Sequence, residues 1–159
     1  MIQIGQIAPD FCLPNSDEIE LCLRDIKGGW LIIYFYPKDN TPGCTTEAVD
    51  FSENMPELID LETTVIGISP DSPAKHKQFI EKNSLKPIFL SDVNREVSLL
   101  FGAYALRMAY GVESLGMIRS TFIINPKGEI AHIWRKVKVA GHVNKVIDVL
   151  KLLQKKALA

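Results

Sequence analysis

The 159-residue sequence contains only three cysteines and three histidines. The cysteines, Cys12, Cys22 and Cys44, form no C-x-x-C pair, so a thioredoxin-type dithiol motif is absent. They are also too few for the disulfide framework that stabilises small secreted domains. Each cysteine is therefore either a small hydrophobic residue or a redox-active thiol.

The histidines, His76, His132 and His142, are scattered and lack the spacing of metal ligands. Neither a G-x-G-x-x-G motif nor a P-loop occurs. We therefore expect no metal ion and no other cofactor. We expect His76 on the solvent side of its helix and His142 in a structural or surface role.

The chain also has almost no net charge and no long apolar run. A net charge of −1 gives no general attraction to nucleic acid or to an anionic membrane. The longest apolar run, "WLIIYFY" at 30–36, is too short to cross a bilayer. The N-terminal residues lack the basic and apolar regions of a signal peptide. We expect a cytoplasmic protein that binds neither nucleic acid nor membrane.

Apolar residues are plentiful, at 47% of the chain, and its length fits a single domain over residues 1–159. Strand and helix patterns alternate along it. Buried strands are expected at 30–37, 64–70 and 87–92, and helices at 45–61, 71–85, 95–103 and 141–156. Pro56 predicts a kink or a break within the first of these helices.

Two hairpins complete the pattern. Residues 10–14 and 18–23 alternate around a polar turn, and a turn centred on Asp17 would place Cys12 opposite Cys22. Residues 120–136 form the second hairpin around the turn "NPKG". This order predicts an α/β fold with a mixed central sheet flanked by helices. On spacing alone, a thioredoxin-like arrangement is one of several options.

The stretch "FYPKDNTPGCTTEA", residues 35–48, places one cysteine where a helix begins. Pro37 ends the strand, Thr41-Pro42-Gly43 make a tight turn, and Cys44 lies in the first helical turn. Unpaired backbone N–H groups and the helix dipole at that position favour thiolate over thiol. The site also lies at the carboxyl edge of the sheet, where α/β proteins place ligands. Cys44 is therefore a candidate nucleophile, with an inert buried cysteine as the alternative.

The segment "PKDNTPGC" fits the P-x-x-x-[TS]-x-x-C motif, and the chain here resembles the peroxiredoxins, in particular the bacterioferritin comigratory protein (peroxiredoxin Q) subfamily. The likeness continues in "GQIAPDFCLPN", "GISPDSPAKHKQFIEKNSL" and "IRSTFIINPKGEI". It implies a thioredoxin-like fold with an N-terminal β-hairpin. It also implies a thiol peroxidase without metal or haem that reduces hydrogen peroxide and alkyl hydroperoxides in antioxidant defence and redox homeostasis.

The resemblance assigns roles to individual residues. Cys44 is the peroxidatic cysteine that becomes a sulfenic acid, while Pro37 and Thr41 shield the thiolate and hydrogen-bond the peroxide. Arg119 stabilises the thiolate and the departing oxygen. Backbone N–H groups at Gly43 and Cys44 hold the substrate oxygen. Without the resemblance, Arg119 would be interpreted as a surface salt-bridge partner.

The sequence departs from the subfamily at Val49, five residues after Cys44, where many members carry a resolving cysteine. Three alternatives follow. Cys12 or Cys22 could resolve the sulfenic acid, although Cα atoms within roughly 7 Å would require the first helical turn to unwind. An external thiol such as thioredoxin, glutaredoxin or glutathione could reduce Cys44, and the resemblance implies the thioredoxin system. Two copies could also join through their Cys44 residues.

Four further points stay open. Glu47, one turn beyond Cys44, either pairs with an arginine or, as we expect, is solvated. Residues 104–117 form an apolar loop that could line the active site, make an oligomer contact or, as we favour, pack under the sheet. The chain is compatible with a monomer or a homodimer. The alternative function is a thiol-based peroxide sensor or redox-regulated binding module.

Overall fold

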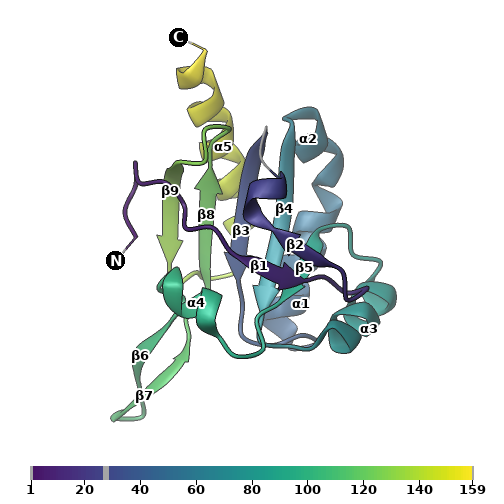
Figure 1. Cartoon of the computed structure of the whole chain (residues 1–159), viewed down its shortest axis with the longest axis vertical. Coiled ribbons are helices and arrows are strands. Elements are labelled where there is room, and N and C mark those ends of the chain that lie inside the picture. Colours follow the sequence, from purple (N-terminus) through teal and green to yellow (C-terminus); the bar gives the residue numbers. More distant parts are fainter. Residues whose placement is uncertain (1, 27–28, 159) are drawn as a thin grey trace.

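A five-stranded mixed sheet forms the centre of the computed structural model, which describes residues 2–26 and 29–158 (Figure 1). Its strand order is β5-β4-β3-β8-β9. The first three strands are parallel, and β8 and β9 run antiparallel to their neighbours. The strands are β3 (Trp30–Phe35), β4 (Thr63–Ser69), β5 (Ile88–Ser91), β8 (Ser120–Ile124) and β9 (Ile130–Arg135). The predicted mixed sheet is confirmed.

Four of the described helices cover one face of this sheet. They are α1 (Pro42–Glu53), α2 (Met55–Asp60), α3 (Pro73–Asn83) and α5 (His142–Ala157). Side chains of a strand alternate between faces, so Ile32, Tyr34 and Tyr36 point into the core beneath the helices. The predicted break at Pro56 is confirmed, because α1 ends at Glu53 and Pro56 lies in the first turn of α2, where no backbone N–H is needed.

The other face carries the N-terminal segment and α4 (Glu96–Leu100). Strands β1 (Cys12–Pro14) and β2 (Glu20–Cys22) form a small hairpin, which the short 3₁₀ helix η1 (Leu23–Ile26) follows. Cys12 lies opposite Cys22, as the predicted register requires. A bridge between Asn15 and Leu90 joins the hairpin to β5, and Figure 1 shows it crossing the front of the sheet.

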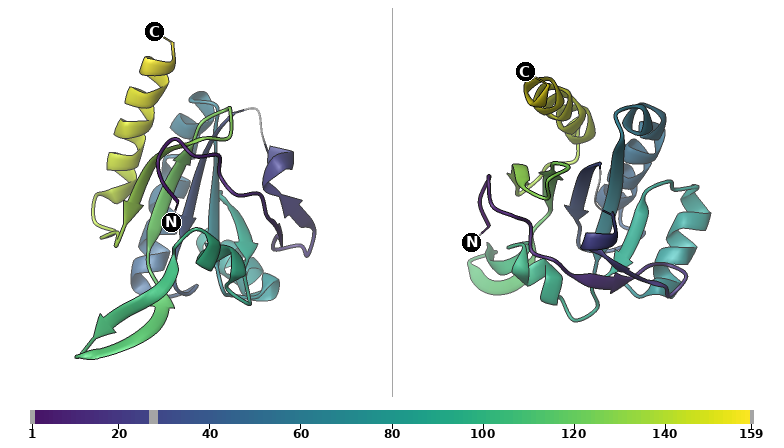
Figure 2. Two further views of the ribbon diagram at one scale, coloured as in Figure 1. Left: turned by 60° about the vertical axis from the view of Figure 1, so that its left-hand side comes forward. Right: turned by 45° about the horizontal axis from the view of Figure 1, so that its top comes forward.

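The interpretation of residues 104–117 as a loop under the sheet is wrong. They form a second hairpin, β6 (Tyr104–Ala109) and β7 (Val112–Met117), which projects from the body of the molecule (Figure 2). Tyr110 and Gly111 both have positive φ, as a two-residue hairpin turn requires. None of the described helices is long and apolar enough to cross a membrane.

Candidate active site

Cys44 lies at the carboxyl edge of β3, on the third residue of α1. Thr41 is the N-cap in an extended conformation and Pro42 follows as the first helical residue, which together begin the helix sharply. The Cys44 side chain is free and 1% exposed. The Thr41 hydroxyl donates to the Lys38 carbonyl at 2.8 Å, and Pro37 is exposed where the strand ends.

Arg119 reaches this site from the neighbouring strand. Because β8 runs antiparallel to β3 with Ser120 opposite Phe35, Arg119 lies beside the end of β3 from which the Cys44 loop departs. Its Nη2 donates to Cys44 Sγ at 3.3 Å, and its Nη1 donates to Glu47 Oε1 at 2.7 Å. One planar guanidinium therefore joins the thiol to a carboxylate one helical turn away.

Glu47 corrects our expectation of a solvated carboxylate. Its side chain is 0% exposed, because α1 turns this face toward the sheet and Arg119. Burial raises the pKa of Glu47 to about 7, although the Arg119 charge and hydrogen bond act to lower it. Burial alone would lower the pKa of Arg119, but the charges of Glu47 and Cys44 outweigh it and raise that pKa. The guanidinium beside Cys44 therefore stays charged.

An open cavity of about 570 Å³ borders Arg119. Leu106, Met108 and Met117 of the projecting hairpin line one part of it, with Val137 among the other residues. Gly43 also lies beside Arg119, because a Cβ added at this glycine would be in ordinary contact with Nη2, at 3.4 Å.

A buried polar network that the sequence did not predict lies next to this loop. His76 is 0% exposed, so its expected place on the solvent side of α3 is wrong. Its Nδ1 lies 2.6 Å from Asp39 Oδ2, and Tyr36 donates to Asp39 Oδ1 at 2.6 Å. The only sequence signal was the position of Asp39 between Pro37 and Thr41.

His142 has the structural role that we expected. Burial, with smaller effects from Lys145 and Arg119, lowers its pKa to about 4. The Nε2 atom of the neutral ring lies 2.8 Å from the Thr121 hydroxyl oxygen, within hydrogen-bond distance. This contact ties the start of α5 to β8, the strand that Arg119 precedes.

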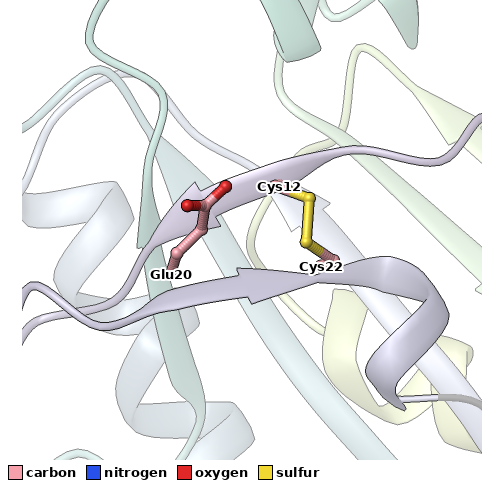
Figure 3. Close-up of side chains that lie close together, drawn as sticks. All are labelled: Cys12, Glu20 and Cys22. Carbon is pink, nitrogen blue, oxygen red and sulfur yellow. A yellow bond between two sulfur atoms is a disulfide. The ribbon is translucent and has the colours of Figure 1, made fainter.

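Cys12 and Cys22 are not brought to Cys44. They are joined to each other in a disulfide across the hairpin, with Glu20 beside them (Figure 3). Leu13 of this hairpin belongs to the core on one face of the sheet, whereas Cys44 belongs to the core on the other. The central sheet therefore separates this disulfide from the free thiol.

Among the residues that the structure describes, two groups of side chains have donor atoms close enough to hold a metal ion. They are Cys12, Glu20 and Cys22, and Asp39, Asp71 and His76. The sulfurs of the first group are bonded to each other. The donors of the second group hydrogen-bond one another and their neighbours. Cys44 belongs to neither group, so its contacts do not depend on a metal ion.

A buried cysteine in the first turn of a helix, hydrogen-bonded by an arginine on a thioredoxin-like fold, defines a cysteine-based peroxidase. Residues 4–133 match the AhpC/TSA family, and the chain belongs to that family. It is 48% identical to a peroxiredoxin bcp of Helicobacter pylori over 149 residues, which cover 94% of this chain and 98% of the relative. It is 42% identical to peroxiredoxin Bcp of Bacillus subtilis, covering 98% and 99% of the two chains.

A solved structure agrees with this assignment. Bacterioferritin comigratory protein of Xanthomonas campestris, studied for its alkyl peroxide reduction activity, superposes with a TM-score of 0.88 at 38% identity. The match covers 96% of this chain and 97% of that one. The protein is thus a peroxiredoxin, and the predicted thioredoxin-like fold is confirmed.

Proposed function

We propose that this peroxiredoxin, a single domain over residues 1–159, reduces hydrogen peroxide and organic hydroperoxides with Cys44 as its peroxidatic cysteine. The contact that carries this assignment is the one between Arg119 Nη2 and Cys44 Sγ. A guanidinium at 3.3 Å and a helix N-terminus both place positive charge beside the sulfur, as attack on a peroxide by a cysteine nucleophile requires.

In the proposed reaction the thiolate attacks one peroxide oxygen, so that an S–O bond forms as the O–O bond breaks. The sulfur is oxidised to sulfenic acid, and the departing oxygen takes a proton to become water or an alcohol. Arg119 stabilises the negative charge on that oxygen. The backbone N–H groups of Gly43 and Cys44 at the start of α1 bind the peroxide, because they lack partners within the helix. The Thr41 hydroxyl donates to the Lys38 carbonyl, so its oxygen is left to accept a hydrogen bond from the peroxide.

The cavity beside Arg119 supports organic hydroperoxides as substrates, because part of its lining is apolar, although Arg107, Glu113 and Lys136 also line it. Leu106, Met108 and Met117 offer carbon and sulfur surface to an alkyl group, while Arg119 marks the polar end. The alkyl peroxide reduction studied in the Xanthomonas campestris relative is consistent with this choice. The hairpin at 104–117 would then be a substrate-binding element.

The thiol that reduces the sulfenic acid is proposed to come from outside the chain. Val49 replaces the local resolving cysteine, and the sheet separates the Cys12–Cys22 disulfide from Cys44. Thioredoxin or another thiol reductant would restore Cys44. We place the enzyme in the cytoplasm, as a monomer or homodimer that serves antioxidant defence and cell redox homeostasis.

A turnover assay tests the proposal. Cys44→Ser should abolish peroxide consumption, whereas the matched Cys12→Ser/Cys22→Ser variant should consume many peroxides per chain when thioredoxin and its reductase are supplied. Activity that survives Cys44→Ser would refute the assignment. Consumption that stops at one peroxide per chain in the wild type, with every thiol reductant supplied, would instead indicate a peroxide sensor.

A further inference from the structure

Asp39 is the most heavily bonded residue of the loop that leads to Cys44. Its backbone N–H donates to Asp71 Oδ2 at 2.8 Å, and the Ser69 hydroxyl donates to the same oxygen at 2.7 Å. Its own carboxylate is bonded by Tyr36 through one oxygen and lies 2.6 Å from His76 through the other. Burial raises the pKa of Tyr36 far above its usual value, so its hydroxyl remains a donor.

The histidine completes the network. Its Nε2 lies 3.1 Å from the Leu90 carbonyl, which can only accept, so Nε2 carries a proton. A second proton lies between Nδ1 and Asp39 Oδ2, whichever of the two groups holds it. Asp39 and His76 together therefore carry no net charge, whereas removal of one partner would leave the other buried and unpaired.

The network joins the loop to β3, β4, β5 and α3. Tyr36 follows β3, Ser69 and Asp71 belong to the end of β4 and its loop, and His76 lies on α3. Within the loop, Pro37, Lys38 and Asn40 are exposed, whereas Asp39 is buried. Asp39 is thus the anchor of a loop that is otherwise in solvent.

We infer that Asp39 and His76 are positioning residues that hold loop 37–41, and with it the first turn of α1, so that Cys44 meets Arg119. The inference rests on the proposed function of Cys44. Two residues separate Asp39 from the start of α1, and Cys44 is the third residue of that helix. Displacement of the loop would move Sγ away from Nη2 and open the buried thiol to solvent.

This role predicts opposite changes in two reactions of Cys44. In Asp39→Ala the second-order rate with hydrogen peroxide should fall on the order of tenfold or more, because the thiolate is no longer held against Arg119. Alkylation of Cys44 by iodoacetamide should accelerate on the order of tenfold, because the 1% exposed thiol becomes accessible. His76→Ala should give the same pair of changes, and the double variant should be no worse than either single one.

Asp39→Asn is the rescue variant. An amide at this position can accept from Tyr36 and donate to Nδ1 of a neutral His76, which still donates to Leu90. Both rates should return to within about threefold of the wild type. Ser98→Ala is the matched control, because it removes a buried 2.7 Å hydrogen bond to Asp92 on the α4 side without touching the loop. It should lower the urea midpoint and leave both rates unchanged.

Tyr36→Phe keeps the test decisive if Asp39→Ala does not fold, since it removes a single hydroxyl and should shift both rates in the same directions by about threefold. A fall in the peroxide rate without faster alkylation, or two unchanged rates, would overturn the positioning role. Failure of the proposed function is distinguishable, because a wild type that alkylates at Cys44 but consumes no peroxide would refute that function alone.

Discussion

Replacement of Arg119 by alanine is the perturbation that the site geometry predicts most directly. The variant removes the donor to Cys44 Sγ and, at the same time, the ion-pair partner of Glu47. Glu47 then loses the two interactions that lower its pKa, so burial keeps its carboxyl protonated at neutral pH. We therefore expect Arg119→Ala to lower the rate of the peroxide reaction much more than the stability of the fold.

The expected loss of rate can be worked out from the distance between Arg119 Nη2 and Cys44 Sγ. Two unit charges 3.3 Å apart interact by roughly 5 kcal/mol at an effective dielectric constant of about 20. In the alanine variant, water that fills the space of the guanidinium replaces part of this electrostatic stabilisation. We expect the peroxide step to lose about 3 kcal/mol, or on the order of 100- to 1,000-fold, as when one oxyanion donor is removed elsewhere.

Competition with a haem peroxidase for hydrogen peroxide measures this step without the reductant. Arg119→Lys is the matched control: it keeps the charge but cannot bond Sγ and Glu47 Oε1 with one planar group, so its rate should lie between those of alanine and wild type. A rate for Arg119→Ala within threefold of wild type, in a protein with an unchanged urea midpoint, would refute the reasoning.

Three further predictions concern neighbouring groups. Glu47→Gln keeps an acceptor for Arg119 but removes the negative charge that Glu47 gains in the wild type as pH rises through about 7. The peroxide step of the variant should therefore run on the order of threefold faster than that of the wild type above this pH, and at the same rate below it. Identical pH–rate profiles of the two proteins would contradict this prediction. Thr41→Val should slow the same step on the order of tenfold while Thr41→Ser retains it, as stopped-flow single turnovers can measure; equal rates would exclude a role for the hydroxyl. His142 has a folded-state pKa lowered from 6.5 to about 4, so the unfolded chain binds the extra proton and stability should fall by about 2 kcal/mol as pH drops from 6.5 toward 4. Urea unfolding at these pH values should show a loss that His142→Gln reduces, and an equal loss in both proteins would refute it.

The sequence predicted the features that depend on local pattern. The apolar run of β3, the break before Pro56 and the hairpin register that pairs Cys12 with Cys22 are set by neighbouring residues. The position of Cys44 in the first turn of a helix was also predicted, but the tight turn expected at 41–43 is instead the N-cap Thr41 and the first two residues of α1. Arg119 was assigned only through the resemblance, because no local pattern links it to a cysteine 75 residues earlier.

The features that the sequence did not predict depend on tertiary approach. Glu47 looks like an exposed helix carboxylate until β8 brings Arg119 beside it, 72 residues along the chain. His76 lies between two lysines in a polar helix, yet α3 turns it toward Asp39 and Leu90. For the hairpin at 104–117 the error was the reverse: its apolar residues predicted burial, but several of them are exposed.

The central claim is that Cys44 forms a sulfenic acid that no other cysteine of the same chain resolves. Intact mass and peptide mapping after one equivalent of hydrogen peroxide, with dimedone present, test it most directly. The account predicts one dimedone adduct, on Cys44, with no disulfide that includes this residue. A disulfide that joins Cys44 to Cys12 or Cys22 within one chain would contradict it.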